Sequence, residues 1–349
     1  MLLFKTLRAQ ALIWALSMVA ALSVQAQTST PMADEIVLKN GSRLIGSVSE
    51  IRDQVLTLET DFAGTLSIEM DQVASVHTES PVVVLKVDES VVRENPLLLD
   101  EGLVEVPGAD QTYPLQDLLV VNPEPWELGQ GYRWTGVVNF ALALERGNSD
   151  TDELDYNLES VWRSKRDRYT FRLNGEIDEA NGEKNADNWQ ATGKYDYFQL
   201  LEDPNYVGLL AFAEKDKFRD LDLRYLIGPY IGRQFYDEPV FSMSGELGFS
   251  YVTEEYNIAE DQDYGASNWN LHASSDFLGG DSSLYFDQIG IWNLEDTADV
   301  VVNTTFGLSF PLLWSLEAAA EVLFEYDSGA VDDVDDLDET YKFRIGYTW

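Results

Sequence analysis

The last nine residues of the chain constrain its fold more than any other stretch. Over Tyr341–Trp349 every odd-numbered position is aromatic or aliphatic, whereas the even-numbered positions carry lysine, arginine, glycine and threonine. A strict period of two predicts a β-strand with one apolar face and one polar face. A receptor can bind such a strand by adding it to an open sheet edge. We therefore expect barrel-assembly machinery to recognise the strand that ends at Trp349.

The same alternation recurs throughout residues 130–349. It forms twelve segments of 10 to 16 residues, near 132–145, 152–164, 168–178, 188–199, 205–215, 221–236, 240–253, 263–277, 283–294, 299–310, 314–327 and 339–349. Connections after even-numbered segments are short, and most of those after odd-numbered segments are longer and acidic. A tilted strand needs about 9–11 residues to cross a membrane. The pattern predicts an all-β fold, a 12-stranded antiparallel transmembrane β-barrel in the bacterial outer membrane, with both termini in the periplasm.

Neighbouring residues in these segments differ in polarity, which predicts the two faces of the barrel wall. Apolar residues such as Phe140 and Phe249 would contact outer-membrane lipid. Polar residues such as Arg172, Glu246 and Arg344 would line the lumen. Lipid outside and a polar lumen inside explain both sets.

Aromatic residues at the end with short connections predict a girdle at the membrane interface. Each strand offers one: Trp134, Trp162, Tyr169, Tyr197, Tyr206, Phe235, Phe241, Phe277, Tyr285, Phe310, Trp314 and Trp349. In the fifth segment this assignment turns Val207, Leu209 and Ala211 toward the lumen. Around Asp287 either parity is consistent with the pattern.

The N-terminus has the layout of a secretory signal peptide. Lys5 and Arg8 precede an apolar run, and Val24 and Ala26 place compact residues at the positions that signal peptidase reads. We expect residues 1–26 to be removed by cleavage after Ala26. The chain contains no cysteine, which excludes disulfides, thiolate metal sites and a cysteine nucleophile.

Short β patterns fill residues 34–121. Two β runs around the turn dipeptide Asn40-Gly41, followed by three more, predict a small SH3-like or Sm-like module at 34–79. A weaker echo of this pattern predicts a second module at 82–121, and the proline-containing residues 122–129 are interpreted as a linker to the barrel. We expect these modules to lie in the periplasm, where a periplasmic partner could dock on them.

The charge of the chain argues against nucleic-acid binding. It carries 23 Lys and Arg against 62 Asp and Glu, a formal net charge of −39. Phosphate contacts dominate nucleic-acid affinity, and an acidic surface repels them. We expect no nucleic-acid partner.

Two sets of residues resemble a catalytic site or a metal-binding loop, but neither has the arrangement that such a site requires. His272 shares the polar face of one strand with Asn270 and Ser274, which suggests a hydrolase, but i±2 neighbours are what any polar strand face offers. The acidic segment Asp327–Glu339 lacks the glycine that an EF-hand loop requires. We predict no enzyme activity, no catalytic, cofactor-binding or metal-ligating residues, and no cofactor.

Several motifs resemble a known family. They are Asn148-Ser149, Leu223–Tyr236 and Tyr341–Trp349 in the barrel, and Val37–Gly46 with Asp61–Gly64 in the first module. The barrel resembles the salt-induced outer-membrane proteins, YdiY-like chains that are described only as a domain of unknown function. The resemblance implies an outer-membrane location and a link to salt, and it implies no substrate, catalytic residue or cofactor.

Two functions are therefore consistent with the sequence. The first is a passive pore or structural barrel for small solutes or ions. The second is an envelope docking protein that binds a partner through its acidic loops or periplasmic modules. Acidic and basic residues are mixed on the inner face, so both an open lumen and one plugged by ion pairs are consistent with the pattern.

Overall fold

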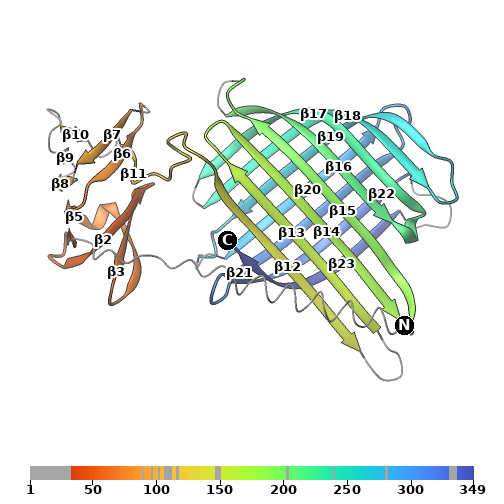
Figure 1. The fold of residues 1–349 in the computed structure, drawn as a ribbon, viewed down its shortest axis with the longest axis horizontal. Coiled ribbons are helices and arrows are strands. Elements are labelled where there is room, and N and C mark those ends of the chain that lie inside the picture. Colours follow the sequence, from red (N-terminus) through yellow and green to blue (C-terminus); the bar gives the residue numbers. More distant parts are fainter. Residues whose placement is uncertain are drawn as a thin grey trace. The chain divides into compact units, whose positions relative to one another are not determined.

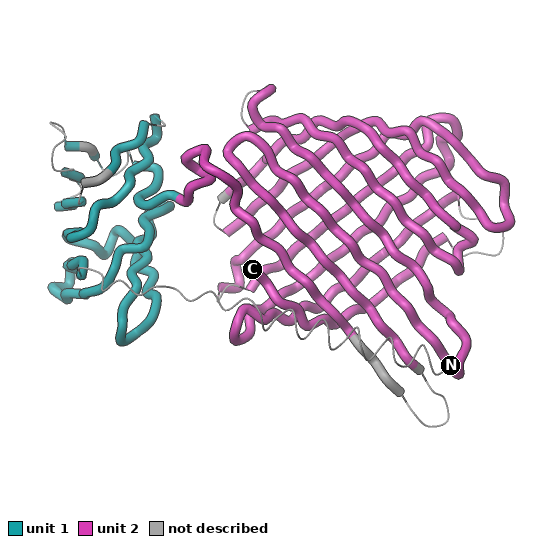
Figure 2. The backbone as a smooth tube through the Cα atoms, in the orientation of Figure 1, with its two compact units in different colours: residues 1–123 teal, residues 124–349 magenta. Residues whose placement is uncertain are grey.

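The chain forms two compact units, residues 1–123 and 124–349 (Figure 2). The computed structural model describes residues 33–88, 90–95, 97–100, 103–105, 112–114, 118–145, 151–201, 204–238, 240–279, 282–329 and 336–349. The predicted signal peptide and residues 330–335 of the acidic segment lie outside this range. Among the described residues, no helix has the length and apolar character needed to span a membrane.

The first unit is a β-sheet built from short strands (Figure 1). Its elements are β1 (Asp34–Leu38), β2 (Arg43–Arg52), β3 (Val55–Thr60), β4 (Gly64–Glu69), η1 (Met70–Gln72), β5 (Val73–His77), β6 (Val82–Lys86), β7 (Val91–Asn95), β8 (Leu98–Asp100), β9 (Leu103–Glu105), β10 (Thr112–Pro114) and β11 (Leu118–Val121). The strand order is β10-β9-β8-β5-β1-β2-β11-β6-β7, and β3 pairs with β2 and β4. This sheet confirms a small β module before the barrel.

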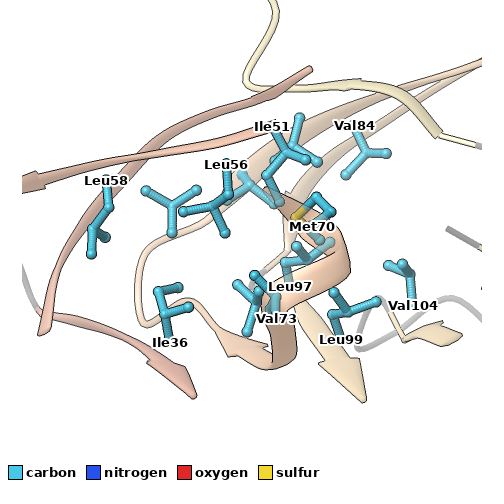
Figure 3. Packing of buried hydrophobic residues seen from close by; sticks show 14 residues of the cluster. Ile36, Ile51, Leu56, Leu58, Met70, Val73, Val84, Leu97, Leu99 and Val104 are labelled. Atoms are coloured by element: carbon cyan, nitrogen blue, oxygen red, sulfur yellow. The ribbon is translucent and has the colours of Figure 1, made fainter. Parts of the chain in front are cut away.

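One hydrophobic core holds this unit together. Alternate residues of the strands point into it, as the close view shows for Ile36, Leu56 and Val104 (Figure 3). These side chains come from both predicted modules, because β1 and β3 belong to the first and β9 to the second. The buried Asp34 carboxylate accepts hydrogen bonds from the backbone N–H groups of Val48 (2.7 Å) and Glu79 (2.9 Å), which satisfies its charge within the core.

The second unit is a closed antiparallel barrel of twelve strands, β12 to β23 in chain order (Figure 1). They are β12 (Arg133–Glu145), β13 (Thr151–Arg163), β14 (Asp167–Ala180), β15 (Glu183–Tyr197), β16 (Asn205–Asp216), β17 (Leu221–Glu238), β18 (Phe241–Tyr256), β19 (Gln262–Ser275), β20 (Ser283–Asn293), β21 (Val300–Pro311), β22 (Leu316–Asp327) and β23 (Leu337–Thr348). A short helical turn, η3 (Lys217–Arg219), follows β16. The predicted number of strands is confirmed, and each predicted segment overlaps one observed strand.

The C-terminal strand closes the barrel as its alternation indicated. β23 pairs with β12 from Val137↔Thr348 to Phe140↔Ile345. Beyond this ladder, the backbone groups of Gly136 and Trp349 exchange two hydrogen bonds of 3.1 Å. The Trp349 ring also lies 5.6 Å from that of Trp134. Closure leaves the sheet without an open edge.

The connections differ less in length than the sequence predicted. The expected loop at 179–187 is a two-residue turn, because β14 continues to Ala180 and β15 begins at Glu183. Asn181 and Gly182 both adopt positive φ, 52° and 87°, as a tight hairpin turn requires. Strand pairing therefore extends through charged residues that the polarity pattern assigned to a loop.

The outer face of the barrel is apolar. Its exposed large side chains include Phe140, Phe171, Leu209, Ile227, Ile231, Leu247, Phe249, Phe306, Phe343 and Ile345. Most of the predicted girdle is also exposed, including Trp134, Trp162, Tyr169, Phe235, Phe241, Phe277, Phe310 and Trp314. The inner face is polar, and it buries Asp155, Asp196, Arg224, Glu246, Glu321 and Arg344 among others.

For the fifth strand, β16, the prediction of which alternate residues face the lumen (the parity of the strand) is wrong. Leu209 is 46% exposed, whereas Tyr206 is fully buried. The Tyr206 hydroxyl donates to Glu246 inside the barrel, so Tyr206 belongs to the lumen and Val207, Leu209 and Ala211 face outward. Tyr285 of β20 also leaves the predicted girdle, because its hydroxyl donates to Glu321.

Candidate functional site

A cavity of about 510 Å³ lies inside the barrel. Its lining comes from β12 to β23 and includes Arg172, Glu246 and Arg344, which the alternation placed on the inner face. The cavity is therefore enclosed by the whole wall. Charged groups from facing parts of that wall determine its shape.

Glu246 of β18 is the centre of one network. Both of its carboxylate oxygens accept from the Lys194 ammonium at 2.6 Å. Glu246 also accepts from the Tyr206 hydroxyl at 2.9 Å and from the Asn270 amide at 3.1 Å. These four hydrogen bonds satisfy the charge of Glu246 at the cavity wall.

Asp196 of β15 is the centre of a second network beside the first. It is fully buried and accepts from the Arg168 guanidinium at 2.6 Å and from the Tyr230 hydroxyl. The Tyr230 ring covers Gly208, where a Cβ atom would lie 2.2 Å from it. The glycine thus makes room for the ring to lie flat against the inner wall.

The basic residues of the terminal strand form a third network. Arg344 donates to Asp155 at 2.7 Å and also to Glu321. Lys342 donates to Asp155 and, at 2.8 Å, to Glu176. These bonds connect β23 with β13, β14 and β22, so they reinforce the seam where the barrel closes.

The fourth network crosses the lumen at the end of the barrel where β16, β18 and β22 terminate. We call it the Arg224 cluster, and it comprises Arg224, Glu214, Glu254 and Asp327. Arg224 is only 5% exposed, and its guanidinium lies 2.5 Å from Glu214, 2.5 Å from Glu254 and 3.3 Å from Asp327. Because Asp327 belongs to β22 and the other members to β16, β17 and β18, the contact joins non-adjacent parts of the wall.

Part of the inner face is apolar, but not at Val207, Leu209 and Ala211, which the sequence pattern turned toward the lumen. Phe212, Leu226, Ile291 and Val301 line the cavity and belong to one hydrophobic cluster. We call these four residues the apolar wall. They come from β16, β17, β20 and β21, and the wrong parity of β16 concealed one of them.

The structure does not bring the suspected hydrolase residues together. His272 faces the lumen, and its Nδ1 lies 2.8 Å from an Asp287 oxygen. Asn270 instead donates to Glu246. Among the described contacts of His272, none involves Ser274. The pairing also assigns Asp287 to the inner face.

No group of three or more histidine, aspartate or glutamate residues among the described positions is arranged to hold a metal ion. This statement does not extend to residues 330–335, which belong to the acidic segment.

The fold and its lumen define a closed β-barrel with an apolar exterior and a charged interior. Residues 138–349 match the family described as "Protein of unknown function, DUF481", and the chain belongs to that family. No curated protein matches the sequence significantly.

Solved structures with low similarity to the chain include several barrels. The NanC porin is 10% identical, with a TM-score of 0.38 over 61% of this chain and 98% of that one. The translocator domain of the autotransporter NalP from Neisseria meningitidis is 9% identical, with a TM-score of 0.36 over 63% of this chain and 88% of that one. A further porin is 10% identical, with a TM-score of 0.31 over 91% and 98% of the two chains.

Proposed function

We propose that the protein is a bacterial outer-membrane barrel that acts as a passive pore for small solutes or ions. One observation carries the proposal: a charged cavity of about 510 Å³ lies inside a closed barrel whose exposed outer residues are apolar. Exposed apolar residues in such number would be unfavourable in water and are what a lipid-facing wall requires. A charged cavity of this size can admit hydrated small solutes.

The lumen supports a narrow pore. Sixteen-stranded porins leave a wide aqueous channel, whereas eight-stranded barrels are filled by side chains. Twelve strands lie between these cases, and the Arg224 cluster further narrows the end of the lumen that it crosses. We therefore expect small single-channel conductance with brief openings.

Planar-bilayer recording of the purified protein tests the pore. Thr305 and Phe306 are neighbours on β21, with Thr305 lining the cavity and Phe306 exposed outside. Thr305→Trp should lower the conductance and Phe306→Trp should leave it unchanged. A bilayer that stays silent with correctly folded protein contradicts the proposal.

The remaining parts of the proposal concern the envelope around the barrel. We propose that residues 1–26 are a cleaved signal peptide and that the β modules before the barrel lie in the periplasm. We also propose that the assembly machinery recognises the strand ending at Trp349. The proposed link to salt rests on the sequence resemblance. It is tested by measuring the amount of protein in cells grown with and without added salt.

Partner docking is the second candidate function. Residues 34–121 expose large apolar side chains, including Phe62, Val87 and Leu103, which are 75%, 62% and 52% exposed. Such residues are available to a periplasmic partner. A silent barrel whose N-terminal unit retains a specific envelope protein would favour docking over the pore.

A further inference from the structure

The cavity has walls of two kinds. The apolar wall of Phe212, Leu226, Ile291 and Val301 lines one part of it, and charged and amide side chains line the rest. Pockets that bind organic molecules combine apolar lining with a few polar groups and have volumes of about 300–1,000 Å³.

Two glutamates of the lining, Glu317 and Glu325, form no ion pair with a lysine or arginine among the described residues. Glu325 of β22 lines the cavity, and its described hydrogen bond is a long one of 3.4 Å from the Gln190 amide. Glu246 and Glu321 are each bonded to a lysine or arginine. Among the described residues, no lysine or arginine forms an ion pair with Glu325. Arg219 and Lys342 act on Glu325 only from beyond ion-pairing distance, so the partly buried carboxylate can still accept a cation from a ligand.

Glu325 lies beside the apolar wall. In the β21–β22 register it is opposite Asn303, and Val301 is two residues further along the same face. Such diagonal neighbours are separated by about 7–8 Å. Ile291 pairs directly with Val301 and continues the apolar surface onto β20. An anionic group and an apolar surface are therefore placed within the span of one small molecule.

We propose that the lumen binds small organic cations in which an ammonium group is joined to an apolar group. The ammonium pairs with Glu325, and the apolar group covers Val301 and Ile291. This inference extends the proposed pore by naming a class of solute for its lumen. The binding itself requires only that the lumen is accessible, and it does not require that the barrel conducts. The inference identifies the permeant or blocking solute class as apolar amines.

Isothermal titration calorimetry of the full chain in detergent tests the site with three probes. 2-Phenylethylammonium carries both features, 3-phenylpropionate reverses the charge and ethylammonium lacks the ring. We expect the first probe to bind at least tenfold more tightly than each of the others. Equal affinity for 2-phenylethylammonium and 3-phenylpropionate would overturn the assignment of Glu325.

Two variants with matched controls test whether Glu325 and Val301 contact the ligand. Glu325→Gln should weaken 2-phenylethylammonium at least tenfold without weakening 3-phenylpropionate, which a general structural defect would not do. Glu339→Gln removes the same charge at an exposed position and should have no effect. Val301→Thr keeps the shape and should weaken binding several-fold, whereas Val302→Thr, on the opposite face, should not. Unchanged affinity in both Glu325→Gln and Val301→Thr would overturn the proposal.

Conductance separates this inference from the pore. Binding that depends on Glu325 in a barrel that stays silent in bilayers would refute the pore and support the site. Conduction without selective binding of 2-phenylethylammonium would support the pore and refute the site.

Discussion

Replacing Arg224 tests whether the lumen is held together by ion pairs. Its guanidinium contacts Glu214 and Glu254 at 2.5 Å and Asp327 at 3.3 Å, and its side chain is 6% exposed. Arg224→Gln removes the cation and leaves three carboxylates close together. Breaking a buried ion pair in this way costs about 3–5 kcal/mol. We expect the free energy of unfolding to fall by about that amount at neutral pH.

Urea unfolding in lipid vesicles, followed by tryptophan fluorescence, measures the loss. Arg233 provides the matched control, because it lies on the same strand, is exposed and bonds Asn205 at 3.3 Å. Arg233→Gln should change stability by less than about 0.5 kcal/mol. Adding Glu254→Gln to Arg224→Gln should recover part of the loss, since it removes one uncompensated charge. Equal stability of Arg224→Gln and the unmodified protein would refute the reasoning.

Three further substitutions test other parts of the barrel, the first two by the same urea unfolding and the third by a folding assay. Tyr206→Phe removes the 2.9 Å hydrogen bond to Glu246 and should cost about 1.5–3 kcal/mol, the usual contribution of a bond to a charged group. Gly307→Val places a Cβ atom 2.0 Å from the Tyr285 ring and should cost about 1–3 kcal/mol through overpacking. Trp349→Ala removes a ring contact at the barrel seam, so it should slow folding into vesicles, measured by the mobility of unheated protein in gels.

Each of these substitutions has a control at a site with fewer contacts. Tyr341→Phe acts on an exposed ring, and Gly265→Val adds a side chain where nothing lies within 4 Å. Trp314→Ala removes a tryptophan that is 85% exposed and takes part in none of the described ring contacts. If each control substitution had the same effect as the test substitution it is paired with, the named contacts would not be what stabilises the barrel.

The barrel could be predicted from the sequence because the alternation of polar and apolar residues is a local requirement that each strand meets separately. A strand between lipid and a polar lumen must alternate, and each of the twelve segments carries that signal independently. The C-terminal strand shows this most clearly: Tyr341, Phe343 and Ile345 are exposed outside, whereas Lys342 and Arg344 are bonded inside. Errors in single strands therefore left the strand count intact.

The wrong predictions arose where an aromatic residue fits both environments. Tyr206 and Tyr285 occur at the level of the interfacial girdle, but each lies inside and donates to a carboxylate on another strand. The available signal was a glycine on the neighbouring strand. Gly232 lies under the Tyr206 ring and Gly307 under the Tyr285 ring, each leaving space that a Cβ atom would fill. That signal requires the register, which alternation alone does not determine.

The candidate site was predictable only in part. The charged lining followed from parity, including Arg172, Glu246 and Arg344. The ion-pair partner of each charged residue could not be predicted from the alternation. The Arg224–Asp327 contact, for example, joins residues 103 positions apart on strands that are not neighbours. The apolar wall was also missed: the wrong parity of β16 concealed Phe212, and the pattern did not indicate that Leu226, Ile291 and Val301 meet it in one cluster.

Lipid contact of the outer face is the central claim, and the absence of cysteine from the chain permits a direct test. Single cysteines replace the exposed Phe306 or its neighbour Thr305, which lines the cavity, and each is labelled with bimane. The protein is then reconstituted in vesicles with brominated lipids, which quench a fluorophore in contact with their chains. The account predicts strong quenching at position 306 and little at 305. Equal quenching at both positions, or none at 306, would contradict it.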